Sequence, residues 1–228
     1  MEHSIKAYPP LLVLASKSPR RLEIIGNAWP YSFAIKPSND KEDTPDKNES
    51  VEAYTSRIAL AKVKAISNDK CPNRFFVGAD TAVSVDGSIL LKPSSEIDAL
   101  TMLQNLRNKA HTVSTSVSIN SSLIDEPIVI STITKVHFRN YSHQEIRNYI
   151  AYGAPFDKSG GYAIQDKTFN PATKIDGCYL NVVGLPICAL KQQIDKISPD
   201  DAKSIKLLSC TDCYTSPNKL LEKTRGVK

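Results

Sequence analysis

The sequence predicts an α/β protein with a mixed, twisted sheet and flanking helices. Two short continuous apolar runs, at residues 11–15 and 75–79, are typical of strands buried on both faces. Two longer runs, at 112–119 and 128–138, alternate apolar and polar residues, as strands with one covered face do. Apolar residues at helical spacing lie between these runs, so helices are expected to pack on the sheet.

The first helix is expected directly after the first strand. Ser18 is suited to the N-cap, Pro19 to the first helical position, and Gly26 to the end of a helix over residues 19–25. The next expected elements are a polar, acidic loop over 39–50 and a helix over 51–67.

Turn and capping signals predict the elements of the second half. The dipeptide Asp86-Gly87 predicts a hairpin of residues 83–85 and 89–91. The further expected elements are a helix from Ser94 or Ser95 through Leu106, a helix begun by the capping box of Ser142 and Glu145 and ended near Gly153, short strands at 162–164 and 179–183, and a helix from Pro186 to about Ile197. The main domain is expected to span residues 1–197, followed by an extension over 198–228 with a weak helix and a polar tail.

Composition limits the classes of function. The formal net charge of +5 comes from 29 basic and 24 acidic residues that are scattered along the chain, which suits an anionic ligand without requiring one. A nucleic-acid-binding module is disfavoured, because there is one Trp and no basic stripe interleaved with aromatic residues. The N-terminus lacks a signal-peptide pattern, no window approaches the roughly 20 apolar residues of a membrane span, and five cysteines form no disulfide framework. A cytoplasmic protein with no membrane partner is therefore expected.

The strongest local signal is the first strand–helix junction. A helix N-terminus offers backbone N–H groups and the positive end of the helix dipole. The hydroxyls of Ser16 and Ser18 and the guanidinium groups of Arg20 and Arg21 lie beside it, and guanidinium binds phosphate oxygens in a bidentate manner. These residues indicate either a phosphate site or an ordinary capped helix whose arginines are solvated.

A second candidate site begins at Asp80, which follows the buried run 75–79. Open α/β sheets bind ligands at the carboxyl ends of their strands, and a hard cation such as Mg²⁺ requires oxygen ligands. Glu42 and Asp43, in the acidic loop, are candidates for a second acid. The alternatives are that Asp80 caps a turn and that the loop acids are simply hydrated.

Other reactive residues form no pattern by themselves. Lys62 lies in a predicted helix and Lys92 follows the hairpin, where lysines are usually surface residues. Cys210 and Cys213 form one CxxC pair without the second pair or the histidines of a zinc site.

Taken together, six segments resemble the Maf-like family of nucleoside triphosphate pyrophosphatases. The resemblance covers about residues 11–190, and its specificity comes from the order and spacing of the segments. They are LASKSPRR at 14–21, GADT at 78–81, LLKP at 90–93, FRNYS with EI at 138–146, FDKSGGYAIQ at 156–165 and NVVGLP at 181–186.

The resemblance implies an elongated, two-lobed α/β body related to the inosine triphosphatase fold, with the active site in a cleft between the lobes. It implies cleavage between the α and β phosphates, a divalent metal (Mg²⁺, Mn²⁺ or Co²⁺) and a homodimer. Ser16, Ser18, Arg20 and Arg21 would bind the phosphates, Asp80 would act as base or metal ligand, and Lys62 and Lys92 would offset transition-state charge.

The resemblance also bears on the base. The branch of the family that acts on dTTP and UTP has Arg, Thr and Gln at three selectivity positions, and this chain has Arg20, Thr81 and Gln165. A Gln amide both donates and accepts, so it can pair with the O4 and N3–H edge of uracil or thymine. The expected substrates are dTTP, UTP and modified pyrimidine nucleotides.

Two features depart from the family pattern. Asp43 stands where the family usually has Glu, so the metal geometry differs or Glu42 serves instead. The chain also continues about thirty residues past the usual end of the family. The Asp43 replacement leaves one alternative open, a non-catalytic nucleotide-binding regulator of cell division or growth.

Overall fold

The computed structural model describes residues 11–38, 43–67, 74–153 and 155–208. Glu42, Cys210 and Cys213 lie outside these ranges, as does most of the polar tail. Within the described ranges, a mixed sheet of seven strands organises the fold, in the order β2-β1-β3-β5-β6-β7, with β4 paired to β3. The predicted α/β fold with a mixed sheet is therefore confirmed.

The strands are β1 (Leu11–Leu14), β2 (Phe33–Ile35), β3 (Arg74–Val85), β4 (Ser88–Leu90), β5 (Ala110–Ser121), β6 (Ile128–Phe138) and β7 (Ala172–Asp176). The helices are α1 (Pro19–Ala28), α2 (Val51–Ile66), α3 (Glu96–Leu106), α4 (His143–Ala151), α5 (Tyr179–Val183), α6 (Ile187–Ile197) and α7 (Pro199–Lys203), with a short 3₁₀ turn η1 (Ser159–Gly161). The strand β1 pairs in parallel with β2 and β3, and the other pairings are antiparallel.

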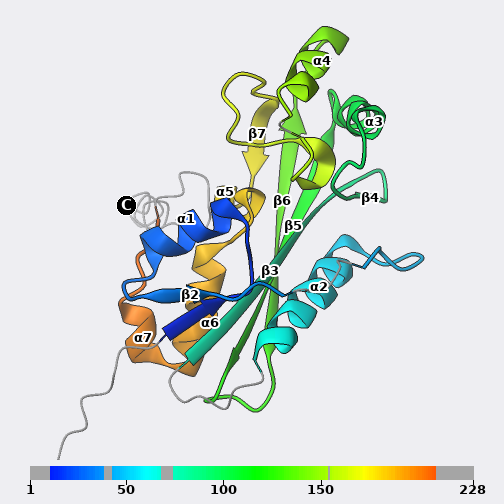
Figure 1. Cartoon of the computed structure of the whole chain (residues 1–228). Coiled ribbons are helices and arrows are strands. Elements are labelled where there is room, and N and C mark those ends of the chain that lie inside the picture. The colour runs from blue at the N-terminus through cyan, green and yellow to red at the C-terminus, as the bar shows by residue number, and fades with distance from the viewer. Residues whose placement is uncertain (1–10, 39–42, 68–73, 154, 209–228) are drawn as a thin grey trace, which may run out of the picture.

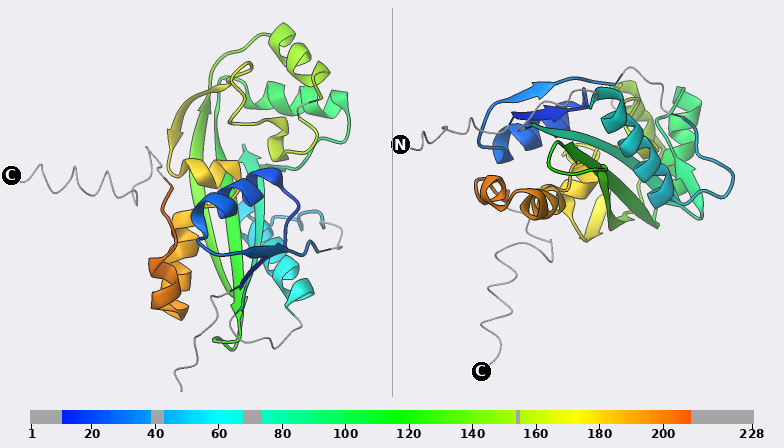
Figure 2. Two further views of the ribbon diagram at one scale, coloured as in Figure 1. Left: turned by 60° about the vertical axis from the view of Figure 1, so that its left-hand side comes forward. Right: turned by 90° about the horizontal axis from the view of Figure 1, so that it is seen from below.

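Helices cover both faces of the sheet, as Figures 1 and 2 show. The helix α2 packs on one face, where Val63 and Ile66 contact Val13 and Phe76. The helices α1, α6 and α7 pack on the other face. The long strands β5 and β6 run on past this body to a second group of elements, α3, α4 and β7 (Figure 1).

The hydrophobic core has two main parts, one at each end of the long strands. The first lies between the sheet and α1, α6 and α7, and it includes Leu14, Ile25 and Val77. The second lies among α3, α4 and the far ends of β5 and β6, and it includes Leu103 and Ile146. The elongated, two-lobed body that the sequence led us to expect is thus built on shared strands.

A close approach fixes α2 over β3. A Cβ atom at Gly78 would lie 2.8 Å from Val63 Cγ2 and 2.9 Å from the Ala59 carbonyl oxygen, so no larger residue fits without a shift. The neighbouring positions of β5 that face α2 carry serines, and Ser116 Oγ lies 2.7 Å from Thr55 Oγ1. Small residues on the sheet therefore bring α2, which carries Lys62, close to the centre of β3.

Most predicted elements are present, and the turn at Asp86-Gly87 has the positive φ angles of a tight hairpin, 51° and 78°. The predicted strand at 75–79 is longer than expected: β3 continues to Val85, so Asp80 lies within it, three residues past the last residue paired to β1. The short edge strands β2 and β7 were not predicted.

The strands predicted at 162–164 and 179–183 are wrong. Tyr162 has extended dihedral angles, but Ala163 N donates to Tyr149 Oη at 2.9 Å rather than to a neighbouring strand. Residues 179–183 form α5, although valine favours strands. Cys178 caps this helix, and the fully buried side chain of Asn181 donates hydrogen bonds to neighbouring strands. Tertiary contacts therefore override the local preference.

The weak helix expected after Pro199 is α7, and the chain beyond it returns to α1. Ala202 and Ile205 are buried in the same core as Ile24 and Ile25. The backbone N–H of Lys206 donates to the Ala28 carbonyl at 2.9 Å. Within the described residues, no helix combines the length and the apolar character needed to cross a membrane.

Candidate active site

A cleft of about 560 Å³ lies between the two lobes. Its near wall includes residues 15–21, Lys62 and Asp80, and its far wall includes residues 157–159 and 162–165. The cleft brings together nine residues that the sequence singled out: Ser16, Ser18, Arg20, Arg21, Lys62, Asp80, Thr81, Lys92 and Gln165. Five of the six segments that carry the family resemblance thus contribute residues to this cleft, and the segment at 138–146 does not.

The near wall begins where β1 ends. The hydroxyl of Ser16, which is 7% exposed, accepts a hydrogen bond from Ser18 N at 3.2 Å. Ser18 occupies the N-cap of α1 as predicted, but its side chain makes no capping hydrogen bond. The start of α1 is therefore shaped by the turn and by Pro19 rather than by a side-chain cap.

Asp80 is the most buried carboxylate of the cleft. It is 6% exposed, and its Oδ1 accepts a hydrogen bond from Lys62 Nζ at 2.7 Å. Successive residues of a strand point to opposite faces, so Asp80 points toward α2 and Thr81 toward α1. This ion pair fixes the position of the carboxylate.

The guanidinium of Arg21 is held by three protein groups. Its Nε donates to the Gly184 carbonyl at 2.8 Å, its Nη2 to Thr81 Oγ1 at 2.9 Å and its Nη1 to Ser16 Oγ at 3.4 Å. Gly184 has a φ of 124°, and a Cβ there would lie 3.5 Å from Arg21 Nε. The plane of the guanidinium is therefore set before any ligand arrives.

Arg20 connects the near wall to the far wall. Its Nη1 lies 3.3 Å from Asp157 Oδ2, and Lys158 pairs with the same carboxylate. Burial acts to raise the pKa of Asp157, but the hydrogen bond and charge of Lys158 and the charge of Arg20 outweigh it and lower that pKa. The segment 156–165 was part of the family resemblance, but the sequence assigned no role to Asp157 or Lys158. The contact between Arg20 and Asp157 joins residues 137 positions apart, and such a contact leaves no local signal.

The far wall is backed by aromatic residues. Tyr162 lines the cleft, and its hydroxyl lies 2.7 Å from His111 Nε2. The ring of Phe138 lies at 4.5 Å from that of His111 and 4.7 Å from that of Tyr162. Burial, with a smaller effect of His137, lowers the pKa of His111 to about 3. His111 is only 2% exposed, so it belongs to the buried support of the far wall rather than to the surface.

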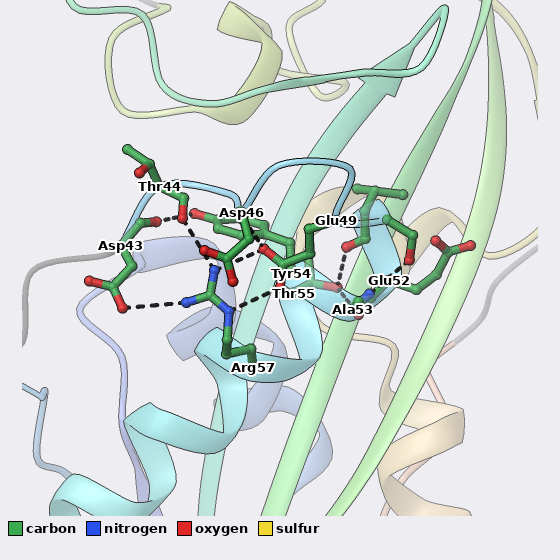
Figure 3. Close-up of polar contacts among 11 residues, drawn as sticks. Asp43, Thr44, Asp46, Glu49, Glu52, Ala53, Tyr54, Thr55 and Arg57 are labelled. Atoms are coloured by element: carbon green, nitrogen blue, oxygen red, sulfur yellow. Dashed lines mark hydrogen bonds and ion pairs between the residues drawn. The ribbon is translucent and has the colours of Figure 1, made fainter.

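Asp43 does not line the cleft, although it was a candidate metal ligand. Its carboxylate is 3.3 Å from Arg57 Nη1, and its side chain is 76% exposed. Figure 3 shows Arg57 of α2 reaching between Asp43 and Glu49, with Thr44 nearby. Glu49 accepts at 2.9 Å from Arg57 Nε and at 2.8 Å from Nη2, and these hydrogen bonds lower its pKa. Asp43 is thus part of an ion-pair cluster that fastens the loop to α2.

The oxygen donors of the cleft fit a divalent cation whose coordination is completed by the phosphates of a bound ligand. Within the described ranges, no group of three or more histidine, cysteine and acidic side chains could hold a metal by itself. Asp80 supplies buried carboxylate oxygen, and Mg²⁺ is commonly held by one or two carboxylates together with substrate phosphates. The site therefore fits an ion that is bound mainly by the substrate and by Asp80.

Sequence comparison places the chain among known proteins. The model of the family described as Maf-like protein matches residues 11–197. A protein named dTTP/UTP pyrophosphatase from Geobacter sp. strain M21 is 41% identical over 177 residues, which are 78% of this chain and 90% of that protein. A protein of the same name from Dictyoglomus thermophilum is 36% identical over 186 residues, 82% of this chain and 95% of that protein.

Likenesses to solved structures are weaker. A nucleoside-triphosphatase (dITP/XTP pyrophosphatase) from Mycobacterium abscessus has a TM-score of 0.35 at 14% identity, over 56% of this chain and 74% of that chain. A HAM1 protein from Coxiella burnetii has a TM-score of 0.36 at 8% identity, over 57% of this chain and 73% of that chain. Scores this low add nothing to the fold described above.

Proposed function

The chain belongs to the Maf-like family, and from that premise we propose that it hydrolyses nucleoside triphosphates between the α and β phosphates, releasing pyrophosphate. The observation that carries the proposal is the cleft itself, in which one buried carboxylate, Asp80, lies among cationic side chains. The names of the relatives, dTTP/UTP pyrophosphatase, support dTTP and UTP as the preferred substrates.

The charge of the cleft suits a triphosphate. The cationic side chains that line it are Lys17, Arg20, Arg21, Lys62, Lys92 and Lys158, and the carboxylates are Asp80 and Asp157. This excess of positive charge is local, since the whole chain has a net charge of only +5. Charge concentrated in a partly desolvated cleft attracts polyanions and favours their rapid association.

The near wall would bind the phosphates. The Ser16 and Ser18 hydroxyls and the backbone at the start of α1 offer donors, and Arg21 presents a guanidinium whose orientation is already fixed. Arg20 would leave Asp157 for the triphosphate, because a polyphosphate carries more charge than one exposed carboxylate. These contacts would hold the α-phosphorus near Asp80.

Asp80 would act on the attacking water. The carboxylate accepts a proton from the water while the water oxygen bonds to the α-phosphorus. The bond between the α-phosphorus and the oxygen that bridges it to the β-phosphorus breaks, and that oxygen leaves with pyrophosphate. Lys62 and Lys92 neutralise the charge that develops on the departing pyrophosphate. A divalent cation held by Asp80 and the phosphates would further neutralise that charge and lower the pKa of the water.

The far wall would read the base. Gln165 lines the cleft there, and its amide can both donate to and accept from the edge of uracil or thymine. Arg20 and Thr81 are the other two positions at which the pyrimidine branch is distinctive. Modified pyrimidine nucleotides, a homodimer and a cytoplasmic location stay predictions.

The test is pyrophosphate release from a panel of canonical and modified triphosphates, with Mg²⁺, Mn²⁺ or Co²⁺ and with EDTA as control. We expect metal-dependent release that favours dTTP and UTP over purine nucleotides. Release of single phosphates would contradict cleavage between the α and β phosphates. Nucleotide binding without any release would instead favour the non-catalytic regulator.

A further inference from the structure

A chain of hydrogen bonds leads from Arg21 into the buried centre of the sheet. Arg21 Nη2 lies 2.9 Å from Thr81 Oγ1, which lies 2.9 Å from Thr115 Oγ1. Thr115 Oγ1 in turn donates to the Asn181 carbonyl oxygen at 2.7 Å. Thr81 and Thr115 are directly paired residues of β3 and β5, and Thr115 is 0% exposed. The chain therefore joins a cleft residue to a residue that no ligand can touch.

The direction of every hydrogen bond in this chain is fixed. A carbonyl oxygen can only accept, so the single hydroxyl hydrogen of Thr115 points to Asn181. Thr81 must therefore donate to Thr115, since Thr115 has no second hydrogen to give. Guanidinium can only donate, so Thr81 accepts from Arg21. All donors are aligned from Arg21 to Asn181, and one cationic donor polarises the bonds that follow.

The acceptor at the end of the chain is itself fixed. The side chain of Asn181, which is 0% exposed, donates to the Val113 carbonyl at 3.0 Å and to Thr134 Oγ1 at 2.8 Å. Three residues later, the Gly184 carbonyl accepts directly from Arg21 Nε. Arg21 is thus tied to the α5 segment twice, once directly and once through the two threonines.

We propose that Thr115 is a positioning residue for the substrate, which aligns the guanidinium of Arg21 through the hydroxyl of Thr81. This inference depends on the proposed function in one respect only, which is that Arg21 binds phosphate. Without the Thr115 hydroxyl, the hydroxyl of Thr81 has no acceptor on β5 for its hydrogen. The Thr81 side chain can then rotate, and its oxygen can move away from Arg21. The guanidinium then loses one of the three contacts that set its plane.

The test compares Thr115→Val with Thr115→Ser. Valine keeps the shape and removes the hydroxyl, whereas serine keeps the hydroxyl and loses a methyl group. We expect Thr115→Val to weaken binding of tripolyphosphate, measured by calorimetry, about tenfold, and to raise the KM for dTTP to a similar extent with little change in kcat. Thr115→Ser should stay within about twofold of the parent protein, since it keeps the hydrogen-bond chain.

The matched control is Ser118→Ala on the same strand. Ser118 is also 0% exposed, and its hydroxyl has no hydrogen-bond partner within the described part of the chain. Removing that hydroxyl should leave tripolyphosphate binding unchanged. If Ser118→Ala weakens binding as much as Thr115→Val does, the effect belongs to packing in β5 and the proposal is wrong.

A double-mutant cycle with Arg21→Lys shows whether Thr115→Val acts by misaligning the Arg21 guanidinium or by loosening the packing of β5. Lysine cannot make the bond to Thr81 in the same geometry, so adding Thr115→Val to it should change binding less than about twofold. Additive losses would overturn the proposal.

If Thr115→Val does not fold, Thr81→Val replaces it, because Thr81→Val breaks the contact to Arg21 and keeps the hydrogen bond from Thr115 to Asn181. Unchanged tripolyphosphate binding in that variant would also overturn it.

Tripolyphosphate distinguishes this proposal from the proposed function. If the parent protein releases no pyrophosphate but its tripolyphosphate binding responds to Thr115→Val as expected, the enzymatic proposal fails and the positioning role stands. If the parent protein releases pyrophosphate and Thr115→Val binds normally, the positioning role fails alone. A parent protein that does not bind tripolyphosphate contradicts both.

Discussion

The near and far walls of the cleft are held in place by different means. The near wall is fixed by charged and polar contacts on regular elements, such as the ion pair of Lys62 with Asp80. The far wall belongs to an irregular segment, which is anchored by Ser159 Oγ donating to the Thr81 carbonyl at 2.8 Å and by Gly160 N donating to the Leu91 carbonyl at 3.0 Å. Aromatic rings then support it from behind.

This difference suggests a division of labour between the walls. Groups that handle phosphate need fixed charge, and the near wall supplies it from the start of α1, from α2 and from the middle of β3. Groups that select a base need shape and a few polar contacts, which a loop on a rigid support supplies. The predictions below test this division with changes to one wall at a time and, last, with a change outside both walls.

The largest effect is expected from Asp80→Asn on the near wall. The amide keeps the shape and an acceptor for Lys62 but cannot take a proton from water, so pyrophosphate release should fall about a thousandfold. Tripolyphosphate binding should change little. Steady-state pyrophosphate release checks this, with Asp157→Asn as a control that removes the other carboxylate of the cleft and costs less than about tenfold. A rate near that of the parent protein in Asp80→Asn would remove Asp80 from the mechanism.

The next effect is a fall in the free energy of unfolding at low pH, caused by His111, which supports the far wall. The pKa of His111 is about 3 in the folded protein against 6.5 as its ordinary value, so the unfolded chain binds the proton more readily. The neutral, buried His111 thus contributes stability that is fully present above pH 6.5 and is lost as the pH falls toward 3. The loss approaches about 1.4 kcal/mol per pH unit within that window.

Urea unfolding at several pH values measures this loss. His111→Gln keeps a polar partner for Tyr162 and does not titrate, so its free energy of unfolding should fall less steeply between pH 6.5 and 4 than that of the parent protein. Identical slopes for the two proteins would show that His111 does not bear on acid stability.

A smaller effect is expected from Gln165→Ala, also on the far wall. Loss of the amide should lower kcat/KM for dTTP about tenfold and reduce the preference for dTTP over dCTP, because a recognition hydrogen bond is worth about 1.4 kcal/mol. Tripolyphosphate, which has no base, should bind as before. Weaker tripolyphosphate binding would place Gln165 among the phosphate groups and break the division between the walls.

The smallest effect is expected outside both walls, at Asp43. An exposed ion pair is worth at most about 1 kcal/mol, so Asp43→Ala should change the free energy of unfolding by less than that and kcat/KM by less than about twofold. A metal titration of activity is the measurement. A large rise in the metal concentration needed for half-maximal activity would instead make Asp43 a metal ligand.

The sequence predicted the near wall better than the far wall, for a physical reason. The strands β1 and β3 are adjacent and parallel, so Ser16, just after the end of β1, and Asp80, just past the part of β3 that pairs with β1, line the same cleft. Both residues lie in local patterns that can be read along the chain. The far wall depends on contacts between distant residues, such as His111 with Tyr162. Valine-rich α5 was mistaken for a strand because Asn181 is held by partners on β5 and β6 that its neighbours in the sequence do not reveal.

The docking of the chain after α7 has a consequence for the order in which the protein can fold during synthesis. The apolar face of α1, with Ile24 and Ile25, shares its core with Ala202 and Ile205. A ribosome makes α1 early and must add Ile205 before that core can close. The turn at the start of α1, which we propose binds phosphate, is therefore synthesised well before the residues that support it from behind.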